Sequence, residues 1–389
     1  MHCRLTTEAV SNDKMIPLTF SLAPTLFFCY NSGNRFRLHS RTEIGRKIKM
    51  AGERATIYDI ASEAGVSIAT VSRVLRGENT VSPKTRQKVE DAIARFGYHP
   101  SSLARGLAGS STRSLGIILP KLLNPHYAMI FTGAQEEARK QGYSMSLFPW
   151  SALDTDAYNP AAMLSERRLD GVIVCLEYLP PDHDELVQGA LKALRRFMPV
   201  VLIGCVPPWY DFPCVTSDNA ALLRKAVAYL TELGHEKIAF IGGVKEDTHP
   251  LRRDVGYQEG LREAKLPFVD SYRVFCKGTA EDGQAALEGI LASLKPEYWP
   301  TAVIALNDLV AMGCQAAARA RGLRLPEDLS IIGCDDIFCA PYLVPALTSF
   351  RIFQQHTGAR AVQLLTSGED RREVTEWELI RRASCAPVR

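Results

Sequence analysis

The sequence has 389 residues, enough for two or three domains that each bury a sizeable hydrophobic core. Hydrophobic residues make up 46% of the chain and charged residues 23%, which excludes a largely disordered protein. The net charge of +3 is unevenly divided, because residues 53–113 hold nine Lys and Arg against six Asp and Glu, whereas residues 114–389 hold 29 against 34. This basic excess favours a phosphate-bearing partner for residues 53–113.

Residues 1–53 carry no clear helix or strand pattern. Residues 15–30 form an apolar run after Lys14, as in a signal peptide, but Pro17 and Pro24 interrupt the run and no small-residue cleavage site follows. The run is also short for a membrane span. We therefore interpret residues 1–53 as a leader that is either disordered or the result of a start assigned upstream of the true translation start at Met50.

Two short helices are predicted next, on either side of Gly65. Residues 57–64 follow the helical i, i+3, i+4, i+7 spacing of apolar positions, and residues 66–75 resume it in a new phase. Thr56 and Ser67 are suitable N-caps, and Gly65 permits the turn between the helices. This pattern is typical of a helix-turn-helix whose second helix enters the major groove of DNA. On spacing alone, an ordinary pair of packed helices fits equally well.

A third helix is predicted from Ser82 as N-cap to about Phe96, with Gly97 ending it. Its apolar stripe can close a three-helix DNA-binding domain over residues 54–99. Residues 100–113 contain several glycines and serines and are only weakly helical. We interpret them as a hinge segment that folds when it docks on DNA.

From residue 114 onward, buried apolar runs alternate with helical patterns in two successive series. Such alternation indicates parallel sheets built from βαβ units, and two series imply two doubly wound lobes. Ligands of open α/β sheets bind at the carboxyl ends of the strands, here between the lobes. Asn307 and Asp335 follow apolar runs and Arg253 opens a helix, so these three residues are candidate ligand-binding residues. The alternative is that Asp308 and Asp336, beside them, only cap helices or pair locally.

Several stretches resemble the lactose-repressor/galactose-repressor (LacI/GalR) family of bacterial transcription regulators: TIYDIASEAGVSIATVSRVLRG, VSPKTRQKVEDAIARFGYHPSSLARGLAG, ALNDLVAMG and LPEDLSIIGCDDI. The resemblance covers about residues 54–388. It implies a two-lobed, periplasmic-binding-protein-like domain over residues 114–389 that binds the effector and forms the dimer. We expect lobe one at about 114–214 plus 345–368, and lobe two at about 215–344 plus 369–389.

The resemblance also implies how the N-terminal part binds DNA. Its recognition helix would contact bases through Ile68, Ala69 and Arg73, although Ala69 can serve merely to allow close approach. The hinge would reach the minor groove through Arg105 and Leu107. The candidate contacts to the DNA backbone, which position the protein without reading sequence, are Thr56, Tyr58, Ser67, Ser72, Lys84, Thr85 and Arg86. In the effector cleft the family positions are Asn124, His126, Tyr127, Asp218, Arg253, Asn307 and Asp335.

Two other classes of protein compete with this interpretation. An enzyme is disfavoured because GxSxG, GxxxxGK[S/T], GxGxxG and HExxH are absent, so we expect no catalytic residues and no cofactor. Ten scattered cysteines lack zinc-binding spacing, so we expect buried thiols in a reducing cytoplasm and no metal. A secreted sugar-binding protein is disfavoured because it has no use for a basic helix-turn-helix.

We therefore predict a cytoplasmic, sequence-specific DNA-binding transcription regulator, a repressor. It is expected to be a homodimer on a pseudo-palindromic operator in double-stranded DNA, without contact to membranes. A small metabolite, a sugar or sugar derivative, would bind between the lobes and control operator affinity allosterically. Both signs of control, induction and corepression, are compatible with the sequence.

Overall fold

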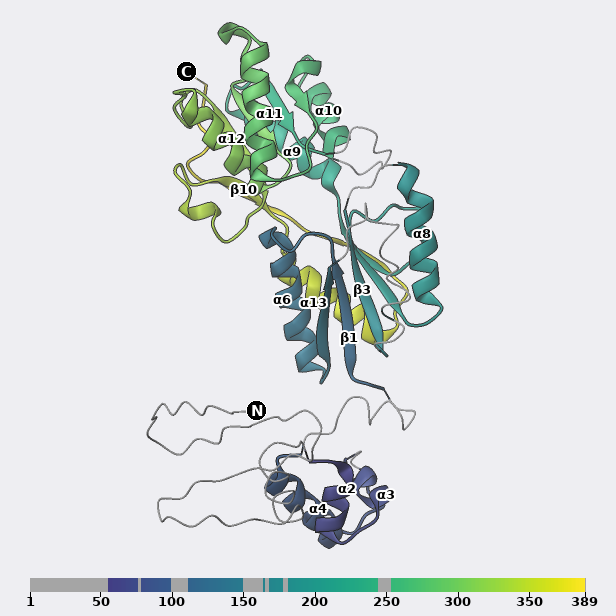
Figure 1. Ribbon diagram of the computed structural model, residues 1–389. Coiled ribbons are helices and arrows are strands. Elements are labelled where there is room, and N and C mark those ends of the chain that lie inside the picture. Colours follow the sequence, from purple (N-terminus) through teal and green to yellow (C-terminus); the bar gives the residue numbers. More distant parts are fainter. Residues whose placement is uncertain are drawn as a thin grey trace, which may run out of the picture. The chain divides into compact units, whose positions relative to one another are not determined.

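The computed structural model describes residues 55–75, 78–98, 111–149, 164, 168–177, 181–243 and 253–388. The chain divides into two compact units, Met1–Pro100 and Ser101–Arg389 (Figure 1). The predicted leader, most of the predicted hinge segment, and its candidate residues Arg105 and Leu107 lie outside the described residues.

The described part of the N-terminal unit contains the helices α2 (Ile57–Ala64), α3 (Ile68–Leu75) and α4 (Pro83–Phe96). Their apolar sides face one another, and Ile60, Val71 and Val89 are fully buried where the helices meet. The predicted helix-turn-helix and the third helix that closes its core are therefore confirmed.

Short-range sequence signals set the ends of these helices. Thr56 and Asp59 form a capping box, in which the Asp59 carboxylate accepts a hydrogen bond from the Thr56 NH at 2.8 Å. Ser82 is the N-cap of α4. Gly65 and Gly97 follow α2 and α4 with φ of 64° and 56°, a left-handed conformation that other residues adopt only with strain.

The C-terminal unit is built on two six-stranded sheets. The strand order of the first is β11 (Arg372–Thr375), β5 (Cys214–Ser217), β4 (Val200–Gly204), β3 (Gly171–Leu176), β1 (Ser114–Leu119), β2 (Ser144–Pro149). The order of the second is β12 (Glu378–Ile380), β10 (Thr348–Arg351), β9 (Ser330–Asp335), β8 (Ala302–Ala305), β6 (Ile238–Ile241), β7 (Arg273–Val274). Neighbouring strands are parallel except β10 and β12. The predicted pair of doubly wound sheets is confirmed.

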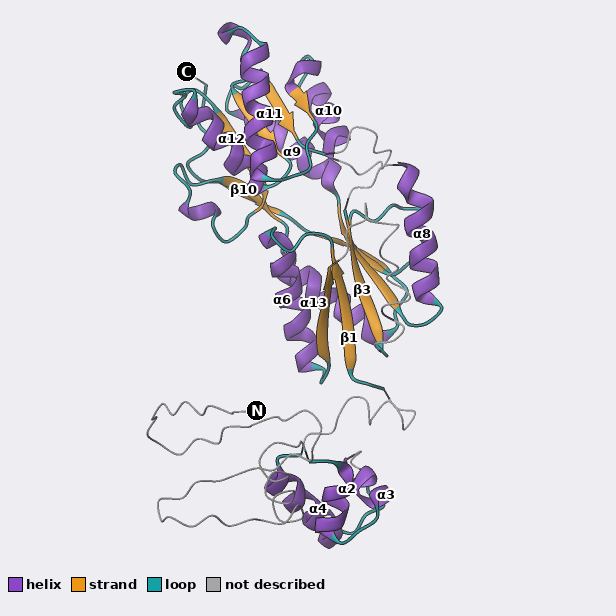
Figure 2. Ribbon diagram, in the orientation of Figure 1, coloured by secondary structure: helices purple, strands orange, loops and turns teal. Residues whose placement is uncertain are grey.

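Helices cover both faces of each sheet (Figure 2). On the first sheet, α6 (Pro125–Lys140) and α13 (Gln354–Ser367) pack on one face and α8 (Pro181–Arg195) on the other. On the second, α11 (Ala280–Ser293) and α12 (Asp308–Ala320) pack opposite α9 (Asn219–Glu232) and α10 (Arg253–Glu263). Short 3₁₀ turns lie at η1 (Asp270–Tyr272), η2 (Pro296–Tyr298) and η3 (Ala340–Tyr342). We call the first sheet with its helices lobe one, and the second lobe two.

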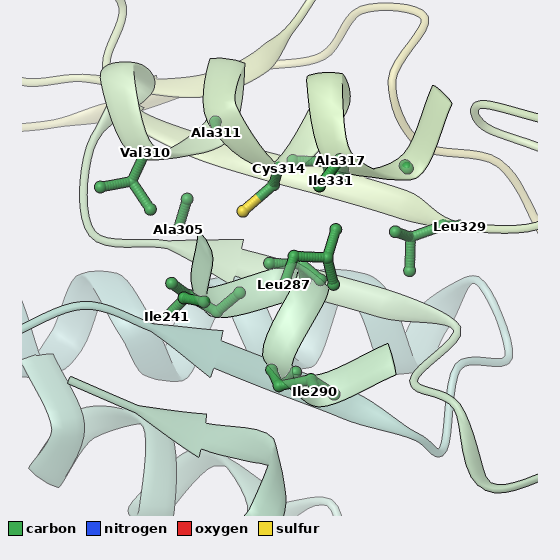
Figure 3. Close-up of a cluster of buried hydrophobic side chains, with 14 of the residues drawn as sticks. Ile241, Leu287, Ile290, Ala305, Val310, Ala311, Cys314, Ala317, Leu329 and Ile331 are labelled. Atoms are coloured by element: carbon green, nitrogen blue, oxygen red, sulfur yellow. The ribbon is translucent and has the colours of Figure 1, made fainter. Parts of the chain in front are cut away.

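Each helical layer seals an apolar core against its sheet. In lobe two, Leu287 from α11 and Cys314 from α12 meet Ile331 from β9, with Ile241 beside them (Figure 3). These four side chains are fully buried, and a buried aliphatic side chain contributes about 1.5–3 kcal/mol. None of the described helices combines the length and apolar character that a membrane-spanning segment needs.

Two helix pairs cross so closely that only glycine fits at the contact. A Cβ on Gly133 of α6 would lie 1.9 Å from the backbone oxygen of Gln355 in α13, and one on Gly313 of α12 would lie 1.9 Å from that of Ala280. A side chain at either position would force the helices apart. The middle of α6 is therefore held against the start of α13, which matters because both helices carry residues of the cavity described below.

The predicted lobe boundaries are wrong in three places. Strand β5 pairs with β4 in lobe one, although residues 215–344 are predicted for lobe two. Strand β10 pairs with β9 in lobe two, although residues 345–368 are predicted for lobe one. Strand β11 pairs with β5 in lobe one, although residues 369–389 are predicted for lobe two. The residues of a strand determine that it is extended, but the sheet that it joins depends on pairing with strands far away in the sequence. The chain crosses between the lobes next to β5, β10 and β11, so their sheets could not be predicted from local sequence.

Candidate functional site

A cavity of about 430 Å³ lies between the two lobes, within the size range of roughly 300–1,000 Å³ that is usual for small-molecule sites. The carboxyl ends of strands from both sheets meet there, as expected for open α/β sheets. Six of the seven predicted effector-binding residues line it: Asn124, His126, Tyr127, Arg253, Asn307 and Asp335.

Asp335 is the acidic residue that lobe two contributes to the cavity wall. It ends β9 with a φ of 112°, a conformation that is rare for any residue except glycine, and its side chain is buried. Its Oδ1 lies 3.4 Å from Nδ1 of His126, which comes from lobe one. Burial raises the pKa of the Asp335 carboxyl, while His126 and Arg253 oppose that rise. Burial also lowers the pKa of His126, which favours a neutral imidazole.

Lobe one contributes a second polar cluster to the wall, of which sequence analysis found Tyr127 but missed Lys121 and Glu177. The Tyr127 hydroxyl donates a hydrogen bond to Glu177 at 2.9 Å, and Nζ of Lys121 lies 3.0 Å from the same carboxylate. Lys121 also donates to the backbone oxygen of Lys277 in lobe two at 3.1 Å. Glu177 and Lys121 come shortly after β3 and β1, so the rule that selected Asn307 and Asp335 could have found them.

Arg253 is positioned from its own lobe. Its Nε donates to Oδ1 of Asn219 at 3.3 Å, and Asn219, the first residue of α9, also lines the cavity. Both side chains are buried and line the cavity. The guanidinium suits recognition of two oxygen atoms on one ligand.

Asn307 lines the cavity, but its amide already serves the fold. Its Oδ1 caps α12 by accepting from Val310 NH at 2.9 Å, and its Nδ2 donates to the backbone oxygen of Gly278 at 3.0 Å. Asp308 is fully buried and accepts from the Ile337 NH at 2.8 Å, so the alternative that Asp308 caps α12 is wrong. Asn307 is the N-cap.

Asp218 does not line the cavity, although its neighbours Ser217 and Asn219 do. Its carboxylate accepts a hydrogen bond from the Ala221 NH at 2.8 Å and caps α9. The structure therefore shows Asp218 as the cap of α9 rather than as a residue of the cavity wall, and effector binding by Asp218 stays a prediction. The alternative reading of Asp336 as a locally paired residue holds, since its carboxylate lies 2.8 Å from Arg351.

The exposed side of α3 presents the predicted base-contacting residues. Ile68, Ala69 and Arg73 are exposed, whereas Val71 and Val74 of the same helix are buried in the core. Ile68 is 40% exposed. An exposed apolar pair beside a guanidinium suits contact with thymine methyl groups and the edge of a guanine.

The residues predicted to contact the DNA backbone differ in what else they do. Tyr58 is 68% exposed and Lys84 is exposed, so both are available to a partner. Thr56 and Ser67 are exposed, and their side-chain oxygens cap α2 and α3 by accepting from the Asp59 and Thr70 NH groups. Arg86 donates from Nη2 to the backbone oxygen of Glu78 at 2.7 Å and so also supports the preceding turn. Ser72 and Thr85 are partly exposed.

Among the described residues, no group of three or more His, Cys, Asp or Glu side chains is arranged to hold a metal ion. None of the described cysteines forms a disulfide, and burial raises the pKa of Cys175 and Cys276 in the cavity wall. Raised thiol pKa values disfavour the thiolate that nucleophilic chemistry needs. The described groups of the cavity are therefore suited to hydrogen bonding and charge recognition.

Two family models match the chain. The family of bacterial regulatory proteins of the lacI family matches residues 56–101, which contain α2, α3 and α4. The periplasmic binding protein-like domain matches residues 227–385, which contain most of lobe two.

Named relatives extend these matches to most of the chain. Catabolite control protein A of Priestia megaterium is 35% identical over 315 residues, which are 80% of this chain and 91% of the relative. The HTH-type transcriptional repressor PurR of Haemophilus influenzae is 33% identical over 314 residues, 80% of this chain and 90% of the relative.

Solved structures of similar proteins have the same architecture. A Lac repressor dimer bound to operator and the anti-inducer ONPF has a TM-score of 0.76 and 25% identity, covering 86% of this chain and 100% of its own. A complex of the transcriptional regulator CelR with cellobiose has a TM-score of 0.63 and 28% identity, covering 85% and 100%. These similar proteins are transcription regulators and not enzymes.

Proposed function

Because the chain belongs to the lacI family of bacterial regulatory proteins, we propose that it is a dimeric, cytoplasmic repressor that responds to a sugar or sugar derivative. As a member of that family it is a DNA-binding transcription regulator controlled by an effector, and not an enzyme. Beyond this family role, we propose the chemical class of the effector, the dimeric assembly, and the residues that bind the effector and the DNA.

The observation that carries the proposal is the cavity between the lobes, whose polar groups come from both of them. Asp335 and Arg253 of lobe two stand across from His126 and Glu177 of lobe one. Carboxylates accept hydrogen bonds from pairs of hydroxyl groups, and a guanidinium donates to two oxygens. Lys121 pairs with Glu177, and Arg253 lies close enough to Asp335 to oppose the rise that burial causes in its pKa. These four charges offset one another, which supports a neutral, hydroxyl-rich effector.

Operator binding is assigned to residues 54–99, with α3 in the major groove and Arg73, Ile68 and Ala69 at the base edges. The segment 100–113 would act as the hinge, with Arg105 and Leu107 in the minor groove. Two copies paired through residues 114–389 would present two such helices to a pseudo-palindromic site. The similar Lac repressor structure, a dimer on its operator, supports this assembly.

Effector control follows if the cleft has different shapes in the DNA-bound and DNA-free states. A ligand that contacts both lobes stabilises one angle between them, and it changes operator affinity only as far as it discriminates between the two states. The opposed contacts on Asp335 make this cleft sensitive to such a ligand, since one carboxylate faces groups from both lobes.

A thermal-shift screen followed by operator binding tests the proposal. Cellobiose, ribose, sugar phosphates and purines are added to the full chain, and a ligand of the native state raises the Tm. Fluorescence anisotropy with genomic operator fragments then measures the effect of each hit on DNA affinity. We expect a neutral sugar to shift both quantities, and Asp335→Ala to abolish the shifts while leaving operator binding intact.

The matched control is Asp270→Ala, because Asp270 is an exposed aspartate of the same lobe. A response of Asp335→Ala equal to that of the wild type would remove Asp335 from the effector site. A dimer that prefers no genomic site over bulk competitor DNA, with or without metabolites, would refute the proposed function.

A further inference from the structure

Asp335 is contacted by lobe one at two different points. Its carboxylate lies 3.4 Å from Nδ1 of His126, near the start of α6. Its backbone oxygen accepts a hydrogen bond from Nε2 of Gln354, the first residue of α13. Both helices pack on the first sheet, whereas Asp335 ends a strand of the second. A single residue of lobe two is thus held by two helices of lobe one.

The Gln354 contact is shielded from solvent. Gln354 is 2% exposed, so water cannot readily replace its amide beside the Asp335 oxygen. Lys121 also joins the lobes, through the backbone oxygen of Lys277, but its side chain is 44% exposed and water competes for that bond. Of these two hydrogen bonds, the one from Gln354 is therefore better suited to fix a geometry.

The parts on either side of this bond are each rigid. The turn after β9 is tied to β10, because the Asp336 NH donates to the Ser349 hydroxyl at 3.0 Å and the Asp336 carboxylate binds Arg351 at 2.8 Å. On the other side, the close crossing at Gly133 fixes α13 to α6. The turn at Asp335 therefore moves with β10, and Gln354 moves with α6.

Only residues 352 and 353 separate these two parts along this crossover. Phe353 has a φ of 48°, a left-handed conformation that is costly for a bulky residue and persists only where its surroundings hold it. The hydrogen bond from Gln354 spans this crossover, and it is one of the contacts that can hold the Phe353 backbone in place.

We propose that Gln354 is a positioning residue that holds the two lobes at a fixed angle through the backbone oxygen of Asp335, and so places the Asp335 carboxylate against His126 in the effector site. The inference rests on the proposed function only in taking that carboxylate as part of the effector site.

The test measures the distance between the lobes without DNA or effector, so its outcome is independent of operator preference and of the effector's identity. Spin labels are introduced as unnatural amino acids at the exposed Arg139 of lobe one and Arg321 of lobe two, because ten native cysteines preclude thiol labelling. Labelled full-length chain is diluted with excess unlabelled chain, and pulsed electron paramagnetic resonance gives the distance distribution. Wild type is compared with Gln354→Met, which keeps the length of the side chain but loses the amide donor.

We expect Gln354→Met to broaden the distance distribution about two-fold, since the lobes then sample angles that the bond excludes. Gln354→Asn, which retains an amide on a shorter side chain, should broaden it similarly if the first variant folds poorly. The matched control is Gln355→Met at the exposed neighbouring position, which should leave the distribution unchanged. Wild-type distributions in both folded Gln354 variants would overturn the proposal, as would equal broadening in the control.

Discussion

Asp308→Asn tests the electrostatics beside the cavity between the lobes. The Asp308 carboxyl is fully buried and contacts the Ile337 NH at 2.8 Å and the Ser349 hydroxyl at 2.5 Å. Burial raises its pKa well above 3.8, and the nearby Asp335 raises it further. Asparagine has nearly the same shape, retains an acceptor for Ile337 and places an amide beside Ser349, but it cannot ionise.

The expected effect is a change in how stability depends on pH. Above pH 3.8 the unfolded chain releases the Asp308 proton, while the folded chain keeps it until pH reaches the raised pKa. The folded state then binds one more proton, so the free energy of unfolding falls as pH rises, by about 1.4 kcal/mol per pH unit. Asp308→Asn removes this contribution, and the variant should become progressively more stable than wild type as pH rises through this window.

Urea denaturation followed by tryptophan fluorescence, between about pH 5 and 8, measures the free energies of unfolding by linear extrapolation. Asp270→Asn serves as the control, because Asp270 is an exposed aspartate of the same lobe. The difference between Asp308→Asn and wild type should grow with pH, whereas the control should follow wild type. Parallel pH profiles for wild type and Asp308→Asn would show that burial does not hold the proton on Asp308, and would refute the reasoning.

Three further changes address the DNA surface and a buried histidine. Arg73→Ala should weaken operator binding by about 1–3 kcal/mol and relax specificity at one base pair, and an equal loss on random DNA in the same anisotropy assay would contradict the assignment. Lys84→Ala should weaken binding to all duplexes alike and reduce the slope of log affinity against log salt by about one; a loss confined to the operator would argue against a phosphate contact. Burial lowers the pKa of His235, so below pH 6.5 this histidine is protonated in the unfolded chain but stays neutral in the folded chain. The free energy of unfolding therefore decreases as the pH is lowered through this range. His235→Gln should lessen this fall in thermal melts, and an unchanged acid profile would exclude His235 as a cause.

Local features of this protein follow from short stretches of sequence. Thr56, Gly65, Ser82 and Gly97 begin or end helices where their side chains and backbone preferences predict. The rule that ligands bind at the carboxyl ends of parallel strands correctly predicted that Asn307 and Asp335 line the cavity, since these strand ends share one edge of a sheet. The same rule, applied to every strand, would have added Lys121 and Glu177.

Two of the candidate site residues have two competing uses, and the structure shows a capping hydrogen bond for each. Asp218 follows β5 as a ligand-binding residue should, yet it also precedes a helix, and the capping bond to Ala221 takes its carboxylate. Asn307 lines the cavity, as a ligand-binding residue should, but its side-chain oxygen accepts the hydrogen bond that caps α12. Sequence cannot rank such uses, because the choice depends on where the side chain points once the neighbouring strands are in place.

The sequence by itself determined the helices of the helix-turn-helix, the two series of alternating strands and helices, and the chemical types of side chain at the strand ends, because each element follows from a pattern within about 11–18 consecutive residues. Only the tertiary structure decided which sheet takes β5, β10 and β11, and that Gln354 meets Asp335 from the other lobe. Strand pairing and contacts between lobes join residues far apart in the chain, and their free energy arises only when distant surfaces are packed together.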